Sequence, residues 1–387
     1  MRKIRSRVLL CQQQTFLYGL VGSSSLNRRL LQLLKAKGHE CHAFTKFHGN
    51  QHKGRSSLLL QIAREPLASL EIDEKRYVRF TIQGITVHSA ARNAVVDTLT
   101  SVISQVNPEV IIISDESDEM LRTAIASGRK VIAVAHQQFD LPFGPLSEHA
   151  DPAGADLYRR AARVATVSKF MADYCQQEGQ VKADVVRFPI FDTSSPSQDI
   201  PQDTARFITL INPCAMKGIS TFVKIAQERP SMLFAAVPTW GTTQADLEAL
   251  RTASNITLLS PQKDIGKIFA QTRVLVTPSW IDTLSTVTVE AMGHGIPTIG
   301  RDIGGIREAK SNIDFLIPSE SDPTVILRQG KICLIPPEHE DISPWISALD
   351  ELTQDDRYHR DLARRSAIAA RNFVGDPYHT WVDLLEG

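Results

Sequence analysis

One stretch, from Pro278 to Ala309, constrains the fold more than any other part of the sequence. The apolar run VLVTPS that leads into it is typical of a buried strand that stops at a proline loop. TLSTVTVEAMGHG then has a helical character; Thr286 or Thr288 can cap its start, and Gly293 or Gly295 can end it. A short strand, IPTIG, and a glycine-containing loop with a helix, RDIGGIREA, follow. This alternation is typical of a parallel α/β sheet.

Ligands of parallel α/β sheets bind beyond the carboxyl ends of the strands. The loop after VLVT and the loop after IPTIG are both at such ends. The sequence therefore predicts one rim that holds Ser279, Asp282, the backbone of Leu284 to Val287, and Gly304-Gly305.

Two carboxylates in this stretch, Asp282 and Glu290, lie eight positions apart, the first in the loop and the second in the helix. The N–H groups at a helix start suit a phosphate, helped by the helix dipole. A carboxylate within the helix suits a vicinal diol, because each oxygen can accept from one hydroxyl. A nucleotide sugar offers both groups. The alternative is structural: Glu290 as a capping or ion-pairing residue and Asp282 as a plain loop residue.

The stretch resembles the donor-site signature of retaining family-4 glycosyltransferases of the GT-B fold. That signature has Pro-Ser, an acidic residue, seven residues, a Glu in a Glu-Ala-Met helix, a Gly-x-Pro, and a Gly-Gly followed by Glu. The matching residues here are Pro278-Ser279, Glu290-Ala291-Met292, Gly295-Ile296-Pro297, and Gly304-Gly305 with Glu308. The resemblance implies an α/β chain with two Rossmann-like parallel-sheet domains that face each other across a cleft.

The sequence departs from the signature at two places. The family usually has Glu where this chain has Asp282, so the carboxylate is kept but is one methylene shorter. The usual Gly-Phe-Gly that follows is replaced by Thr283-Leu284-Ser285. Both changes bear on donor-sugar preference and on turnover.

The resemblance also implies the residues that hold the donor diphosphate. Lys217-Gly218 matches a Lys-Gly whose lysine meets the diphosphate, and Asn212 stands where the family often has an arginine. The N–H groups at the start of the helix complete this set: Leu284, Ser285, Thr286 and Val287. Gly22 closes a loop, Gly19 to Gly22, that resembles the family's glycine loop near the donor phosphate or the acceptor.

Other parts of the donor site are assigned in the same way. His136 follows a predicted strand at the place where the family has a histidine that reaches the donor sugar. Trp240 and Gly241 end another predicted strand near the expected nucleotide. Ser260 to Ile265 would surround the base. His136, Asp282 and Lys217 are the candidate catalytic residues.

The chain is long enough for two domains. Residues 192–205 are rich in Ser, Pro and Asp without apolar periodicity and are predicted as the linker. It separates an acceptor-side domain, 1–191, from a nucleotide-sugar donor domain, 206–371. A last helix of about 372–387 is expected to pack back on the first domain. Within that domain, YVRFTIQGITVHSA predicts paired strands around Gln83-Gly84, and VVRFPIFD predicts the last strand. Ser168 is placed to cap a helix.

Charge and cysteine content exclude several classes. The 43 basic and 43 acidic residues balance, which gives no electrostatic footprint for nucleic acid. Five cysteines without a CxxC spacing indicate reduced thiols in a cytoplasm. No apolar run reaches the length of a transmembrane helix, and the N-terminus lacks the pattern of a signal peptide. Asp115, Glu116, Asp118 and Glu119 form an acidic group better explained as a solvated helix start than as a metal site.

The sequence thus predicts a retaining hexosyltransferase that moves a sugar from a nucleotide diphosphate sugar, a UDP-sugar by preference, to an acceptor hydroxyl. No cofactor and no metal are expected. The acceptor is open: a soluble metabolite, a peptide or a glycan. The alternatives are a GT-B sugar-nucleotide epimerase and a non-catalytic nucleotide-sugar-binding homologue. An NAD-dependent oxidoreductase is disfavoured, because no GxGxxG follows the first strand.

Overall fold

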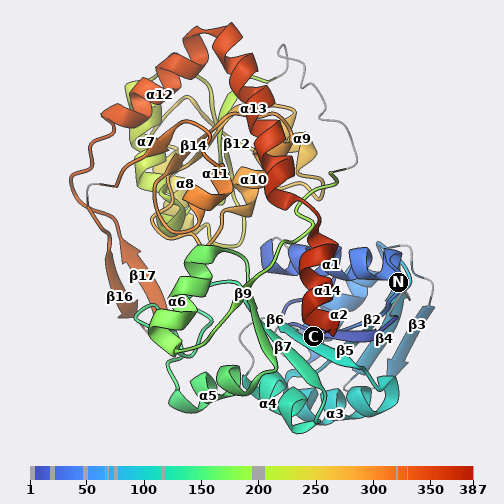
Figure 1. The fold of residues 1–387 in the computed structure, drawn as a ribbon. Coiled ribbons are helices and arrows are strands. Elements are labelled where there is room, and N and C mark those ends of the chain that lie inside the picture. The colour runs from blue at the N-terminus through green and yellow to red at the C-terminus, as the bar shows by residue number, and fades with distance from the viewer. Residues whose placement is uncertain are drawn as a thin grey trace. The chain divides into compact units, whose positions relative to one another are not determined.

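The structure is a computed structural model that describes residues 5–17, 22–46, 51–65, 67, 69–73, 77–114, 118–193, 205–319, 321–328 and 330–386. It divides into two compact units, Met1–Pro189 with Asp376–Gly387, and Ile190–Gly375 (Figure 1). The predicted borders were 191/192 and 371/372, and most of the predicted linker 192–205 lies outside the described residues.

The first unit is built on a nine-stranded sheet in the order β3-β4-β5-β2-β1-β6-β7-β8-β9. All pairs from β5 to β9 in this order are parallel, whereas β3, β4 and β5 pair antiparallel. The strands are β1 (Arg7–Cys11), β2 (Glu40–Lys46), β3 (Ser69–Asp73), β4 (Tyr77–Ile82), β5 (Ile85–Ala90), β6 (Val110–Ser114), β7 (Lys130–Ala135), β8 (Arg163–Thr166) and β9 (Asp184–Val185).

Helices connect these strands, and their apolar faces are buried. In α1, for example, Leu26, Leu30, Leu31 and Leu34 are all at most 5 % exposed, as the leucine spacing of an amphipathic helix requires. The helical segments are α1 (Gly22–Ala36), α2 (Gln51–Ile62), η1 (Arg92–Ala94), α3 (Val95–Val106), α4 (Asp118–Ala126), α5 (Pro152–Arg160), α6 (Lys169–Gly179) and α14 (Pro377–Glu386).

Two local predictions for the first unit are confirmed. β4 and β5 pair around Gln83 and Gly84, whose φ angles of 52° and 72° are those of a tight hairpin turn. Ser168 caps α6, because its side chain accepts from the Met171 N–H at 3.1 Å.

The prediction that VVRFPIFD forms the last strand of this unit is wrong beyond its first residue. β9 ends at Val185, and the backbone of Arg187 bonds to α14 instead of to a neighbouring strand. Its N–H donates to the Thr380 hydroxyl at 3.1 Å, and its carbonyl accepts from the Trp381 indole at 3.0 Å. Trp381 is fully buried, so α14 is anchored in the first unit by a helix-to-backbone contact.

The second unit holds a six-stranded parallel sheet in the order β12-β11-β10-β13-β14-β15. A separate antiparallel hairpin, β16 and β17, stands apart from this sheet (Figure 1). The strands are β10 (Phe207–Ile211), β11 (Phe234–Val237), β12 (Ile256–Leu258), β13 (Thr272–Thr277), β14 (Thr298–Arg301), β15 (Leu316–Ile317), β16 (Thr324–Arg328) and β17 (Lys331–Ile335). The helical segments are η2 (Ala215–Lys217), α7 (Ile219–Glu228), α8 (Gln244–Leu250), α9 (Gly266–Phe269), α10 (Thr286–Gly293), α11 (Ile306–Lys310), α12 (Ser343–Gln354) and α13 (Asp356–Val374).

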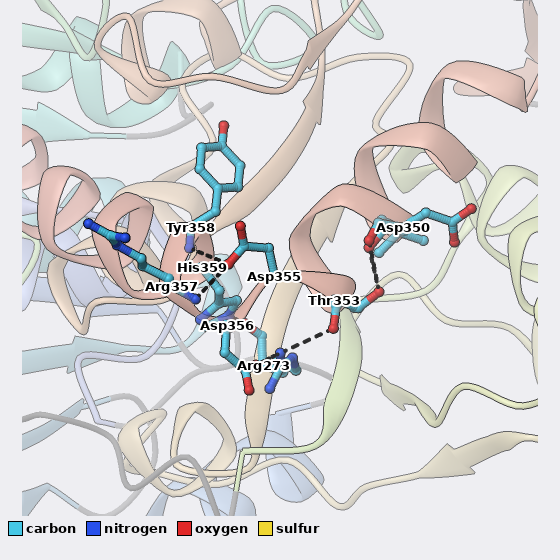
Figure 2. A network of polar contacts seen from close by, with 9 residues as sticks. Arg273, Asp350, Thr353, Asp355, Asp356, Arg357, Tyr358 and His359 are labelled. Atoms are coloured by element: carbon cyan, nitrogen blue, oxygen red, sulfur yellow. Dashed lines mark hydrogen bonds and ion pairs between the residues drawn. The ribbon is translucent and has the colours of Figure 1, made fainter.

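The α12–α13 corner is fastened to the start of β13 by a polar network. Asp355 caps α13 by accepting from the N–H groups of Arg357 and Tyr358 at 2.8 and 3.0 Å. Figure 2 shows Arg273 of β13 beside this corner, where its guanidinium reaches Asp356 at 2.6 Å. The His359 ring donates from Nε2 to the Arg273 carbonyl at 3.0 Å. These bonds fix the amino end of β13, the strand that precedes the predicted donor loop.

α11 carries a buried lysine. The side chain of Lys310 is 1 % exposed and donates to the carbonyl and, at 3.2 Å, to the hydroxyl of Thr298 on β14. Burial lowers the pKa of Lys310 to about 7, against a weaker opposing effect of Asp314. A lysine without a carboxylate partner is costly to bury in its charged form.

This burial predicts that the contribution of Lys310 to the free energy of unfolding rises with pH. Between about pH 7 and the ordinary lysine pKa, the unfolded chain binds more protons at Lys310 than the folded chain does. The buried cysteines have the opposite effect at alkaline pH, because burial raises the pKa of Cys41 and of Cys175 to about 12. The Lys310 contribution is therefore the difference between wild type and Lys310→Met, which we expect to change by roughly a few kcal/mol in urea denaturation from pH 7 to pH 10. Lys310→Met should be more stable than wild type at pH 7 and should lose this slope. Lys267→Met, at an exposed lysine, should keep it; equal slopes in wild type and Lys310→Met would contradict the assignment.

Candidate functional site

The predicted donor residues of the second unit lie at one edge of its sheet. β10, β11, β13 and β14 are parallel neighbours, so the loops after them emerge together. These loops carry Asn212 to Gly218, Trp240-Gly241, Ser279 to Ser285, and Gly304-Gly305. We call this edge the donor rim.

The carboxylate of Asp282 is the centre of the donor rim. It is 9 % exposed, and both of its oxygens are bonded. Oδ1 accepts from the Ser285 N–H at 2.7 Å. Oδ2 accepts from Lys217 Nζ at 2.7 Å and from the Ser279 hydroxyl at 3.2 Å. Two of the three predicted catalytic residues, Lys217 and Asp282, are thus in direct contact.

Backbone hydrogen bonds join the loops around this carboxylate. The Trp280 N–H donates to the Met216 carbonyl at 2.9 Å, and the Gly305 N–H donates to the Asp282 carbonyl at 3.1 Å. The loops after β10, β13 and β14 therefore form one connected structure.

Glycine is required at two of these contacts. A Cβ on Gly218, which has φ +74°, would lie 2.0 Å from the Pro278 carbonyl oxygen. A Cβ on Gly305 would lie 2.0 Å from the Thr283 carbonyl oxygen. Both spacings are far inside van der Waals contact, so the Lys-Gly and Gly-Gly motifs have a packing role whatever the ligand is.

The start of α10 differs from the prediction. Neither Thr286 nor Thr288 caps it; the N-cap is Ser285, in the left-handed region at φ 61°. The Ser285 hydroxyl bonds the Thr288 hydroxyl at 2.8 Å instead of capping. Asp282 accepts from the N–H of Ser285, the N-cap residue itself, so it fixes the loop before α10 and leaves the helix without a side-chain cap. The helix ends at Gly293, as one of the two predicted alternatives, where a Cβ would lie 2.7 Å from the Phe191 ring.

The start of α10 leaves donors for an anion. Leu284 and Ser285 are buried, whereas Thr286 and Val287 are partly exposed. The first N–H groups of an α-helix have no partner within the helix and lie at the positive end of its dipole. Glu290, also partly exposed, follows one turn after Thr286 on α10.

Asn212 joins the Lys217 loop to the Trp240 loop. Its side chain is 6 % exposed, and its Oδ1 accepts from the Gly241 N–H at 3.0 Å. Its Nδ2 has no hydrogen-bond partner in the described part of the chain. Trp240 beside it is 49 % exposed. The prediction that Trp240 and Gly241 end a strand is wrong, because β11 ends at Val237 and these two residues lie in the turn that follows. Of the residues predicted to surround the base, Ser260 is exposed, and Ile265 is partly buried at the start of α9.

In the first unit, His136 follows β7 and is 6 % exposed. Its Nε2 shares a hydrogen bond of 2.9 Å with the Ser114 hydroxyl at the end of β6. Ser114 also accepts from Asn27 at 2.7 Å, and Asn27 donates to Gln12, which follows β1, at 3.0 Å. Burial lowers the pKa of His136 to about 4, so the imidazole is neutral at physiological pH.

The sequence reading missed the partners of His136. Their positions in the sequence could have indicated the contact, because Gln12, Ser114 and His136 each follow or end a strand, and these three strands are adjacent and parallel. Gly22, the remaining predicted donor residue, is the exposed first residue of α1. The rest of its loop, Gly19 to Val21, lies outside the described residues, as do Asp115 and Glu116 of the acidic group.

A buried arginine supports the donor rim from within, and the sequence reading missed it as well. Arg301, the last residue of β14, is 2 % exposed and pairs with Glu340 at 2.5 Å. Its Nε donates to the Pro278 carbonyl at 3.3 Å, and its guanidinium lies 3.5 Å from the centre of the Trp280 ring. Arg301 therefore holds the loop that carries Asp282.

The cysteines, the groups that could bind a metal, and the apolar content of the helices bear on other kinds of site. All five cysteines are free. No three His, Cys, Asp or Glu side chains in the described ranges come together in a way that could hold a metal ion. Across the same ranges, no helix has the length and apolar content needed to span a bilayer.

Comparison with known proteins identifies the fold. Residues 215–329, which include the donor rim from Met216 to Gly305, match the model of the family described as glycosyl transferases group 1. The chain has the GT-B fold. No curated protein matches the sequence significantly.

Solved GT-B structures resemble the chain over nearly its whole length. Sucrose-phosphate synthase from Thermosynechococcus elongatus aligns with TM-score 0.66 and 14% identity over 98% of this chain and 96% of its own. The catalytic domain of starch synthase IV from Arabidopsis thaliana, bound to ADP and acarbose, aligns with TM-score 0.67 and 12% identity over 99% and 100%. HepE from Anabaena, in complex with UDP and glucose, aligns with TM-score 0.67 and 14% identity over 99% of each chain.

The Arg301–Glu340 pair yields a stability prediction. Removing one partner of a buried ion pair leaves an uncompensated charge, so Arg301→Met should lower the free energy of unfolding by about 3–5 kcal/mol. The double variant Arg301→Met/Glu340→Leu should recover part of that loss, because neither charge remains buried. Urea denaturation of the single and double variants measures both values.

The control for this prediction is the Arg229–Asp350 pair, which is joined at 2.6 Å but has side chains 28 % and 29 % exposed. Arg229→Met should lower the free energy of unfolding much less than Arg301→Met does, because solvent screens that pair. A double variant at Arg301 and Glu340 that is less stable than either single variant would refute the interpretation.

Proposed function

We propose that the chain is a retaining, metal-independent glycosyltransferase that moves a hexose from a nucleotide diphosphate sugar to an acceptor hydroxyl. The observation that carries this proposal is the contact between Lys217 and Asp282 beside the start of α10. It brings a cation, a carboxylate and helix N–H groups together on one rim. A diphosphate joined to a sugar is a ligand that matches all three.

Lys217 and the start of α10 serve the diphosphate. An ammonium group has three donors, and Asp282 uses one of them, so two remain for phosphate oxygens. The side chain of Lys217 is 26 % exposed and therefore accessible to a ligand. Of the predicted N–H groups, that of Ser285 is already bonded to Asp282, so the proposed donors are those of Leu284, Thr286 and Val287 at the positive end of the helix dipole. Asn212 Nδ2 adds a neutral donor. Charge on the departing diphosphate would be stabilised by Lys217 during transfer.

Asp282 and Glu290 serve the hydroxyls. A carboxylate offers about four lone-pair sites. Three donors already occupy Asp282, which leaves one site for a sugar hydroxyl. Glu290 on α10 is proposed to accept from the ribose diol. The neutral imidazole of His136 suits a hydrogen bond to a sugar hydroxyl or to the reacting oxygens, the role that the sequence resemblance implies.

The mechanism proposed is front-face substitution, in which the diphosphate oxygen helps to deprotonate the acceptor. This route uses no enzymic nucleophile and no metal. A UDP-sugar is the favoured donor; HepE was solved with UDP and with UDP-glucose, whereas starch synthase IV was solved with ADP. The acceptor is a soluble metabolite, a peptide or a glycan, and the proposed location is the cytoplasm.

The donor site is tested by a thermal-shift panel of UDP-, GDP-, ADP- and TDP-sugars, with and without EDTA. A ligand at one hundred times its dissociation constant adds about 2.7 kcal/mol, enough to raise the unfolding midpoint by roughly 5 °C. We expect one nucleotide sugar to stabilise wild type equally in both buffers. Glu290→Ala should lose this stabilisation, because the ribose diol loses its acceptor.

The matched control is Glu351→Ala, at an exposed glutamate of α12 in the same unit, which should respond as wild type does. If no nucleotide sugar shifts the midpoint at millimolar concentration, the donor-site assignment fails. A shift without any turnover of the bound donor would favour the non-catalytic alternative.

The role of Asp282 gives a separate prediction. Asp282→Asn keeps an oxygen that can accept the Ser285 N–H but removes the charge opposite Lys217. Slow hydrolysis of the donor without acceptor should fall by about 100-fold, as for the loss of one group aligned with the transition state. UDP binding should be unchanged or tighter, because Lys217 is released for the diphosphate. Calorimetry and UDP release measure the two effects.

Ser279→Ala is the control for this experiment, since it removes a neutral donor from the same Asp282 oxygen. It should change hydrolysis much less than Asp282→Asn does. An Asp282→Asn enzyme with the wild-type rate would show that the carboxylate serves only to hold the loop.

A further inference from the structure

Trp240 is distinguished from the other tryptophans by its exposure. The chain has four tryptophans, and Trp280, Trp345 and Trp381 are at most 4 % exposed, whereas Trp240 is 49 % exposed. A single exposed apolar side chain is common on protein surfaces and needs no function. Trp240 differs in its place on the donor rim, in the turn that follows the end of β11 at Val237, and in the hydrogen bonds that hold this turn.

The turn that carries Trp240 is fixed by hydrogen bonds on both sides. The Thr242 N–H donates to the Thr239 carbonyl at 3.2 Å, and the Thr239 N–H donates to the Thr242 hydroxyl at 3.2 Å. The Gly241 N–H donates to Asn212 Oδ1 at 3.0 Å. A Cβ on Gly241 would lie 3.0 Å from both Asn212 Oδ1 and Cys214 Sγ, so the turn packs tightly on the loop after β10. Trp240 is therefore presented on a rigid support, which lowers the entropic cost of binding.

Asn212 supplies a second observation that points to a ligand. Its side chain is 94 % buried, yet Nδ2 has no partner among the described residues. Its Oδ1 is committed to Gly241, which fixes Nδ2 as the free donor. A buried amide donor without a partner is costly, so such groups in native proteins usually await a water or a ligand. Asn212 lies on the loop that leads from the Trp240 contact to Lys217.

The spacing of the strands fits one class of ligand. β11 and β13 flank β10, so the loop with Trp240 and the loop with Asp282 emerge two strand spacings apart, about 10 Å. In a nucleoside diphosphate, the base and the terminal phosphate are separated by the ribose and the first phosphate. With the diphosphate at Lys217, the base reaches the neighbourhood of Trp240, and the middle of the molecule passes Asn212.

We propose that Trp240 is the platform on which the nucleobase of the donor stacks, and that Asn212 Nδ2 donates to an oxygen of the ribose or of the first phosphate. This inference rests on the proposed function, because it takes the diphosphate position from Lys217. An indole stacks on any base, so Trp240 supplies affinity. The hydrogen-bonding edge of the base would then face the loop after β12. This loop is held next to β11, because the Leu259 N–H donates to the Ala236 carbonyl at 2.9 Å.

The test compares probes with and without a base. UDP, ADP and GDP, and separately inorganic pyrophosphate, are titrated by calorimetry into wild type, Trp240→Ala and Trp240→Phe. Loss of one base–aromatic stack weakens binding by roughly 5- to 150-fold. We expect this loss in Trp240→Ala for the nucleoside diphosphate that binds wild type best, with pyrophosphate changed less than about twofold. Trp240→Phe should retain most of the affinity, because it keeps an aromatic face.

Two control variants separate this inference from the function on which it rests. Leu233→Ala removes an apolar side chain that is 45 % exposed at the opposite end of β11, and it should leave every affinity unchanged. Lys217→Met should weaken nucleoside diphosphate and pyrophosphate alike.

The outcomes are distinct. If Lys217→Met weakens both probes while Trp240→Ala binds nucleoside diphosphates as wild type does, the stacking inference is overturned and the proposed function stands. An equal loss of pyrophosphate binding in Trp240→Ala would also overturn it, because the tryptophan would then act through the shape of the loop. If wild type binds neither probe at millimolar concentration, both proposals fail.

Discussion

A single carboxylate, that of Asp282, is bonded by a lysine, a hydroxyl and a backbone N–H that come from two loops. The backbone of the same residue is bonded by Gly305 from a third loop. The short side chain of aspartate suits this arrangement, because its Oδ1 accepts from the N–H three residues further on, that of the α10 N-cap residue Ser285. The chain keeps Ser285 in the left-handed region at the next turn. The departure from the usual Glu and the departure from the usual Gly thus belong to one local structure.

Two cationic side chains are buried in the second unit, that of Arg301 at the end of β14 and that of Lys310 on α11. Arg301 is compensated by Glu340 and by the face of Trp280, so its charge is retained. Among the described residues, Lys310 donates to the oxygens of Thr298, and burial lowers its pKa. Buried charges are expensive unless paired. Arg301 bonds the loop that presents Asp282, whereas Lys310 bonds the first residue of β14, so rim geometry is linked to the stability of this unit through Arg301.

Local features of the fold could be predicted from the sequence because they depend on neighbours in the chain. The hairpin at Gln83-Gly84, the Ser168 cap and the end of α10 at Gly293 are of this kind. The features that were missed join distant residues: Arg301 with Glu340, and His136 with Ser114. The predicted threonine caps of α10 are wrong because Ser285 is the N-cap residue, and its hydroxyl bonds the Thr288 hydroxyl instead of a first-turn N–H. The last strand of the first unit was predicted too long, because the backbone of Arg187 bonds side chains of α14 and not another strand.

The two units place polar side chains at the same structural position, the carboxyl ends of adjacent parallel strands, but with different chemistry. In the first unit, Gln12, Ser114 and His136 form a neutral, desolvated network in which burial keeps the imidazole uncharged. In the second, Lys217 and Asp282 keep opposite charges in contact. A neutral donor suits an uncharged hydroxyl group. A cation suits a phosphate, because it stabilises the negative charge that develops there during transfer. The surface of the first unit therefore suits hydroxyl groups, and that of the second unit suits a diphosphate.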